Sequence, residues 1–132
     1  MFFLRCRSTL ILLLLLFLSS CAPHSSEDFR EEGESISKAL LKELRAIHNK
    51  DQLLAASRRL QYLFDQYADL MLDVDEFYRQ HPHVERLPLS LSNHILSDEL
   101  AAELNRLDHF EGGRQILEKC QEHALYRLNT QL

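Results

Sequence analysis

The chain has 132 residues, which is enough for one small domain, and its 20 acidic and 15 basic side chains give a net charge of −5. This acidic balance argues against binding to nucleic acid or anionic lipid headgroups through bulk charge. The sequence contains no phosphate-binding loop, dinucleotide fingerprint, zinc-protease helix or Gly-x-Ser-x-Gly motif. We therefore expect no cofactor and a role that is not enzymatic.

The N-terminal segment has the order of an export signal. Arg5 and Arg7 precede an apolar run over residues 10–18, and small residues then lead into Cys21. A membrane-spanning helix is the competing interpretation. However, the uncharged stretch over residues 8–22 would be about 22 Å long as a helix, whereas the hydrocarbon core of a bilayer is about 30 Å thick. A plain secretory signal is a second alternative, and the cysteine is what argues against it.

The motif Leu18-Ser19-Ser20-Cys21 resembles the lipobox of bacterial lipoproteins. This resemblance implies that residues 1–20 are removed, that Cys21 receives diacylglycerol, often with a third, amide-linked chain such as palmitate, and that these chains attach the protein to a membrane. In Gram-negative lipoproteins a residue such as Ala22 after the cysteine, in place of aspartate, allows sorting to the outer membrane. The expected location is therefore the bacterial cell envelope, at the outer membrane rather than the inner one.

Removal of residues 1–20 changes the rest of the chain in two ways. Only Arg5 and Arg7 are lost among the charged residues, so the net charge becomes about −7. Once Cys21 carries lipid, Cys120 is the one free thiol left, which excludes an internal disulfide. Residues 21–34 are polar and predict a lipidated tether, which leaves residues 35–132 as the folded domain.

Two helices are predicted in the first half of this domain. Over residues 35–48 the apolar spacing forms one stripe, comprising Ile36, Leu40, Leu44 and Ile47. Asn49 and Gln52 are spaced as an N-cap and its partner at the third helical position, which predicts a new helix. A single helix running through to residue 80 is the alternative.

The second helix, over residues 51–80, has the clearest pattern in the chain. Apolar residues occupy the a, d and e positions of four heptads, a stripe wide enough to face two neighbouring helices: Leu53, Ala56, Leu60, Leu63, Phe64, Tyr67, Leu70, Met71, Val74, Phe77 and Tyr78. Pro82 ends the helix, because the residue before a proline disfavours helical geometry.

The remaining segments also predict helices. A connector over residues 82–91 precedes a helix that begins at Ser92 or Ser97, and the apolar stripe of this helix is Leu96, Leu100, Leu104 and Leu107. Gly112-Gly113 marks a kink or tight turn. The apolar side of the last helix is Ile116, Leu117, Cys120, Ala124, Leu125 and Leu128. The prediction is an all-α fold, a small bundle of three to four helices.

Acidic residues gather on the second half of the long helix. Asp65, Asp69 and Asp73 are successive like-charge neighbours at i,i+4, an arrangement that costs a few tenths of a kcal/mol per pair. One interpretation is a docking strip for a basic partner. The other is a solvated face balanced by arginines, some of them on the later helices, with Asp75 and Arg79 already a favourable pair.

Histidine and cysteine residues suggest two further sites, both incomplete. His81-x-His83 and Cys120-x-x-His123 are each half of a zinc site and lie far apart in the sequence, so no metal site is predicted. Cys120 and His123 share a helix face, but no second catalytic partner is evident near them. A cysteine on an apolar stripe is usually a packing residue.

Apolar residues outside the main stripe give the functional hypothesis. Leu54, Tyr62 and Leu72 lie outside the a, d and e positions, and with Asp69 and Asp73 they are the predicted partner-binding residues. We expect a lipid-anchored binding or assembly factor for another envelope protein. In size, anchor and helicity it resembles the small lipoproteins that pilot or stabilise secretion-system subunits. The alternatives are a small-ligand or metal-binding envelope lipoprotein, with a pocket between helices or at His81 and His83, and a structural surface lipoprotein.

Overall fold

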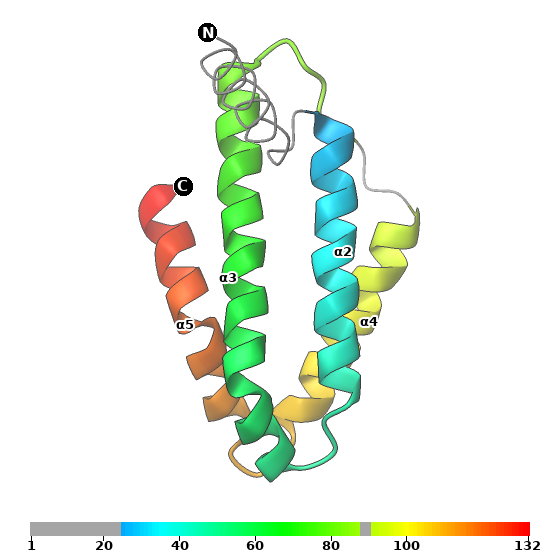
Figure 1. Ribbon diagram of the computed structural model, residues 1–132, viewed down its shortest axis with the longest axis vertical. Helices are drawn as coiled ribbons and strands as arrows, with labels where there is room; N and C mark the ends of the chain where they lie inside the picture. The colour runs from blue at the N-terminus through cyan, green and yellow to red at the C-terminus, as the bar shows by residue number, and fades with distance from the viewer. Residues whose placement is uncertain (1–24, 88–90) are drawn as a thin grey trace, which may run out of the picture.

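A computed structural model of the protein describes residues 25–87 and 91–132, and in these ranges it contains four helices and no strand. The helices are α2 (Ser26–Arg45), α3 (Lys50–Gln80), α4 (Leu91–Asp108) and α5 (Gly113–Gln131). Helix α3 packs against α2 and α5, and α4 packs against α2 (Figure 1). The predicted all-α bundle is confirmed. The export signal and Cys21 lie outside the described residues. No described helix is both long enough and apolar enough to cross a membrane.

Helix α2 begins before the predicted domain boundary. The hydroxyl of Ser25 accepts a hydrogen bond from the Asp28 amide at 3.2 Å, and the helix starts at Ser26. The expected tether through residue 34 is therefore wrong from Ser26 onward. Phe29 is buried against Phe77, with ring centroids 5.3 Å apart, and lies seven residues before buried Ile36, so the apolar stripe extends backward. Phe29 was not recognised as a core residue because the sequence around it is polar.

The helical structure is interrupted between α2 and α3, as predicted. The Asn49 carboxamide oxygen accepts a hydrogen bond from the Gln52 amide at 2.9 Å, and the Gln52 side chain accepts one from the His48 amide at 2.8 Å. The first bond satisfies an amide that the first turn of a helix leaves without a partner, and the second joins Gln52 to the residue before the N-cap. These bonds settle the alternative in favour of two helices.

The α4–α5 turn is built on two glycines. Gly112 has a φ of 73°, which side chains other than glycine rarely adopt. A Cβ at Gly113 would lie 2.0 Å from the Leu107 carbonyl oxygen, so the backbones meet there with no room for a side chain. This confirms the predicted tight turn. Helix α4 begins at Leu91, slightly earlier than the serines suggested.

The main core lies at the end of the bundle where the α2–α3 and α4–α5 turns meet. Its largest fully buried side chains come from three helices: Leu44, Leu53, Leu60, Leu63 and Leu107. In the first two heptads of the α3 stripe the leucines are thus buried, and Ala56 and Phe64 are partly buried against them. The predicted stripe of α5 is wrong at Leu125, which is 52% exposed, because α5 packs mainly along one side, through Leu117, Cys120 and Ala124.

At the opposite end of the bundle the helices separate. Helices α4 and α5 diverge from their shared turn, α4 following α2 and α5 following α3 (Figure 1). Helix α5 has 19 residues and α3 has 31, so α5 is about 18 Å shorter at 1.5 Å per residue. The far half of α3 therefore has less of its apolar stripe covered than the near half.

Candidate functional site

An apolar cleft occupies the end of the bundle where α4 and α5 diverge. It has a volume of about 540 Å³ and lies between α2, α3 and α4, with the terminal residue Leu132 at its edge. Residues from all three helices form its apolar lining, among them Phe29, Leu70, Met71, Val74, Leu96 and Leu100. We call this feature the cleft.

The floor of the cleft is the far half of the α3 stripe. Tyr67 is 37% exposed, whereas Leu60 at the same heptad position is 0% exposed, and Met71 is 41% exposed, whereas Phe64 at its equivalent position is partly buried in the core. The stripe predicted to face two neighbouring helices is therefore only partly covered at these positions. The residue types are suited to burial, but the neighbouring helices have separated before they reach this level.

The rim of the cleft is polar, and many of its polar groups already interact with other residues of the protein. The Tyr78 hydroxyl donates to the Ser26 hydroxyl at 3.0 Å, and the Arg86 guanidinium lies 4.8 Å from the centre of the Tyr78 ring. Asp75 accepts a hydrogen bond from Arg79 at 2.7 Å. On α2, the hydrogen bond from Lys38 and its positive charge lower the pKa of Glu34. The rim thus presents charges of both signs around an apolar floor.

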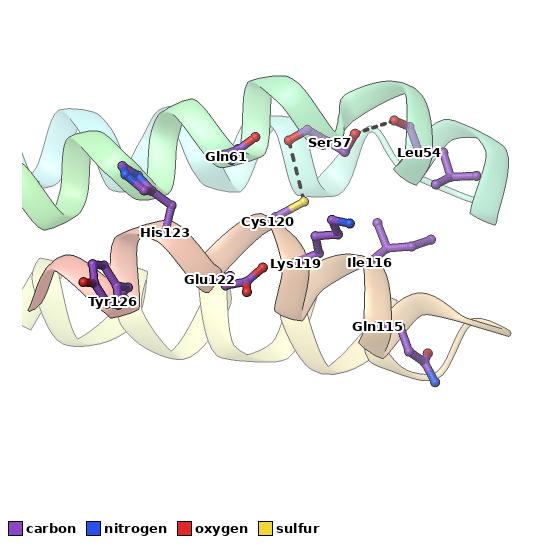
Figure 2. A pocket seen from close by; sticks show the side chains of 10 residues that line it. All are labelled: Leu54, Ser57, Gln61, Gln115, Ile116, Lys119, Cys120, Glu122, His123 and Tyr126. Carbon is purple, nitrogen blue, oxygen red and sulfur yellow. Dashed lines mark hydrogen bonds between the residues drawn. The ribbon is translucent and has the colours of Figure 1, made fainter. Parts of the chain in front are cut away.

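A second concavity, the α3–α5 groove, runs between those two helices and has a volume of about 730 Å³ (Figure 2). Cys120 lies at its base. The thiol of Cys120 points to the Ser57 carbonyl oxygen, 3.6 Å away, rather than to the His123 ring (Figure 2). Burial raises the pKa of the Cys120 thiol, which disfavours the reactive thiolate. This geometry supports packing as the role of Cys120.

Two acidic residues of α3 contact α5. Nδ1 of His123 lies 2.9 Å from the Asp65 carboxylate, to which it donates, and Arg127 forms an ion pair with Asp69. One turn further on, Asp73 is exposed and makes no ion pair within the described part of the chain. Two of the three carboxylates therefore belong to the α3–α5 contact, which favours the interpretation as a balanced face. Docking through Asp69 and Asp73 stays a prediction.

The five predicted partner-binding residues all lie on α3 but have different surroundings. Leu54, 49% exposed, lines the α3–α5 groove. Tyr62, 52% exposed, instead has its ring beneath the Arg59 guanidinium, 5.5 Å away. Leu72 is half-buried, and none of the five lines the cleft.

Tyr67 and Met71 were not predicted to be exposed, because both match the apolar stripe as packing residues. The one signal in the sequence is length, since the last predicted helix is much shorter than the long helix that it must cover.

The described residues contain no group of three or more His, Cys, Asp and Glu side chains placed to hold a metal ion. His81 instead caps α3: its ring stacks on Phe77 at 4.6 Å between centroids, and its Nδ1 lies 2.9 Å from the Phe77 carbonyl oxygen. Comparisons of the chain with protein-family models, with curated proteins and with solved structures find no match.

Proposed function

We propose that this protein is a lipid-anchored component of the bacterial cell envelope that binds an amphipathic helix of another envelope protein in the cleft, without catalysis. The observation that carries the proposal is the partly uncovered far half of the α3 heptad stripe, in which Tyr67 and Met71 are exposed. Tyr67 and Val74 are seven residues apart, and Met71 and Tyr78 are seven apart. Leu53 and Leu60, with the same spacing, are buried against helices of this chain. A stripe of this period is complementary to another helix.

The chemistry of the cleft also suits such a partner. An amphipathic helix binds by placing its apolar face in a groove and leaving its polar face at the rim. The cleft has an apolar floor, and Arg86 and Asp75 offer opposite charges at its edge. Met71 adds an unbranched side chain that adapts to the shape of its neighbour. We propose that the partner supplies a helix that covers the part of the α3 stripe left uncovered by the described helices.

The proposed lipid attachment rests on the lipobox-like motif that ends at Cys21. Two or three acyl chains, each contributing about 0.8 kcal/mol per buried CH₂, make a durable attachment, whereas one chain holds only marginally. Cys21 precedes Ser26 by only a few residues, a span of at most about 18 Å when extended. Ser26 lines the cleft, so a partner would be bound close to the membrane surface.

Site-specific photocrosslinking in intact cells tests the binding proposal. A benzophenone amino acid at Met71 should form an adduct with one envelope protein, and the attached peptide should have an amphipathic helical pattern. The matched control places the same group at Leu125, which is 52% exposed on α5 and lines neither concavity. Equal adducts from both positions, or none from Met71, would refute the proposal.

A separate experiment tests the anchor. Replacement of Cys21 by serine removes the thiol that would receive diacylglycerol, so Cys21→Ser should stay unprocessed and should not incorporate radiolabelled palmitate. Normal maturation of this variant would show that the lipoprotein interpretation is wrong.

A small apolar ligand is the second candidate for the cleft, because its volume of about 540 Å³ lies within the range of small-molecule sites. The crosslinking experiment separates the two candidates. A ligand carrier would retain a small molecule that mass spectrometry detects on the purified protein, and Met71 would give no protein adduct.

A further inference from the structure

We infer that the cleft holds an acyl chain attached to Cys21 while the protein is outside a bilayer, and that membrane insertion empties the cleft for the partner helix. This inference rests on the proposed anchor and on the proposed use of the cleft. It adds an acyl chain of the protein itself as a ligand of the cleft, and it makes access to the cleft depend on the membrane. Binding of the partner would thereby depend on arrival at the membrane.

The position of the N-terminus is the first argument. Helix α2 starts at Ser26, and both Ser26 and Phe29 line the cleft. Cys21 precedes Ser25 by four residues, so its side chain is at most about 14 Å along the chain from the helix cap. An acyl chain on Cys21 therefore reaches the cleft from its α2 end without unfolding any described element.

The lining of the cleft is the second argument. Leu70, Val74 and Leu100 present hydrocarbon, and the exposed side chain of Met71 is part of the floor. At the end nearest the N-terminus, the Tyr78 hydroxyl is already hydrogen-bonded, so hydrocarbon beside it leaves no donor without a partner. An acyl chain would remove from water both its own surface and the exposed part of the floor.

The cleft can shield less hydrocarbon from water than a bilayer can, and this difference determines which of the two holds the acyl chains. A bilayer accepts every acyl chain of a lipoprotein along its whole length, whereas a cleft of about 540 Å³ shields part of this hydrocarbon. The bilayer therefore takes the chains when it is present. An acyl chain and a partner helix would both lie over Tyr67 and Met71, so each excludes the other. A ligand shifts such an equilibrium only through its difference in affinity for the two states.

A photoreactive fatty acid incorporated into the growing cells tests this inference on the full lipidated protein. The purified protein is illuminated in two forms, in lipid nanodiscs and after dilution below the critical micelle concentration of its detergent. In the diluted form we expect crosslinks to the α3 segment 67–74. In nanodiscs the same crosslinks should fall at least tenfold, because the acyl chains then lie in the bilayer.

The paired variants are Met71→Lys and Leu125→Lys, both at exposed positions, with only the first in the cleft. Met71→Lys should reduce the crosslinks to α3 at least tenfold, and Leu125→Lys should leave them unchanged. Equal crosslinking in both forms, or crosslinks confined to the residues around Cys21, would overturn the inference while leaving partner capture at Met71 intact. Absence of the fatty acid from the protein would overturn the anchor and this inference together.

Discussion

Arg106 on α4 offers the sharpest test of how the bundle is held together. Its guanidinium donates hydrogen bonds to the carbonyl oxygens of Leu44 at 2.9 Å and Ile47 at 2.8 Å, where α2 ends. Its Nε donates to Glu103 at 2.8 Å. The Leu44 oxygen also accepts the Ile47 amide at 3.2 Å, so Arg106 adds a second bond there, whereas Ile47 lies beyond the last residue of α2. One side chain thus joins α4 to the end of α2.

The expected cost of removing Arg106 follows from these contacts. A hydrogen bond from a charged donor contributes about 1.5–3 kcal/mol, so two would give about 3–6 kcal/mol as an upper limit. The Arg106 side chain is 36% exposed, so water replaces part of what is lost. We expect Arg106→Met to lower the free energy of unfolding by about 2–3 kcal/mol. Arg106→Lys retains the charge but cannot donate to both carbonyls in one plane, so a loss of about 1–2 kcal/mol is expected.

Urea unfolding followed by circular dichroism at 222 nm measures these losses. With a denaturant slope of about 1.5 kcal/mol per molar, Arg106→Met should lower the midpoint by about 1.5 M. The matched control is Arg58→Met on α3, where the exposed arginine makes no ion pair with any described residue. The reasoning would be refuted if Arg106→Met and Arg58→Met both cost less than about 0.5 kcal/mol, or if Arg106→Lys were fully stable.

Three further predictions use other contacts. Gly113→Ala should cost more than about 2 kcal/mol in the same urea titration, since its Cβ would lie 2.0 Å from the Leu107 carbonyl oxygen; a milder loss would mean that the turn relaxes. The hydrogen bond from Arg114 lowers the pKa of Asp108, so the pair stabilises the fold above about pH 4, and this contribution disappears as the pH falls through the lowered pKa. Thermal melts of the wild type and Asp108→Asn should therefore differ at pH 7 and converge as the pH falls below the lowered pKa of Asp108. Burial raises the pKa of Cys120, so its thiol should react with a disulfide reagent at pH 8 at least about 100-fold more slowly in the folded protein than in urea; equal rates would make Cys120 a candidate nucleophile again.

Several boundaries were predictable because their causes are local in sequence. The break before α3 depends on Asn49 and Gln52, whose side chains bond to amides within four residues. Pro82 predicted the end of α3, which the structure places at Gln80. The start of α2 was less accessible. Phe29 is the lone aromatic residue in a polar stretch, and its burial depends on Phe77, far away in the chain.

The sequence alone predicted the helical class and the position of the long helix, and it is the basis of the proposed attachment at Cys21. Periodicity, caps and the lipobox-like motif all depend on residues that are close together in the chain. Only the tertiary structure decided which parts of a uniform stripe are covered. Leu60 and Tyr67 occupy the same heptad position, yet one is 0% exposed and the other 37%. Heptad spacing states that a residue can be buried against a helix, but the divergence of α4 and α5 determines whether a helix is present there.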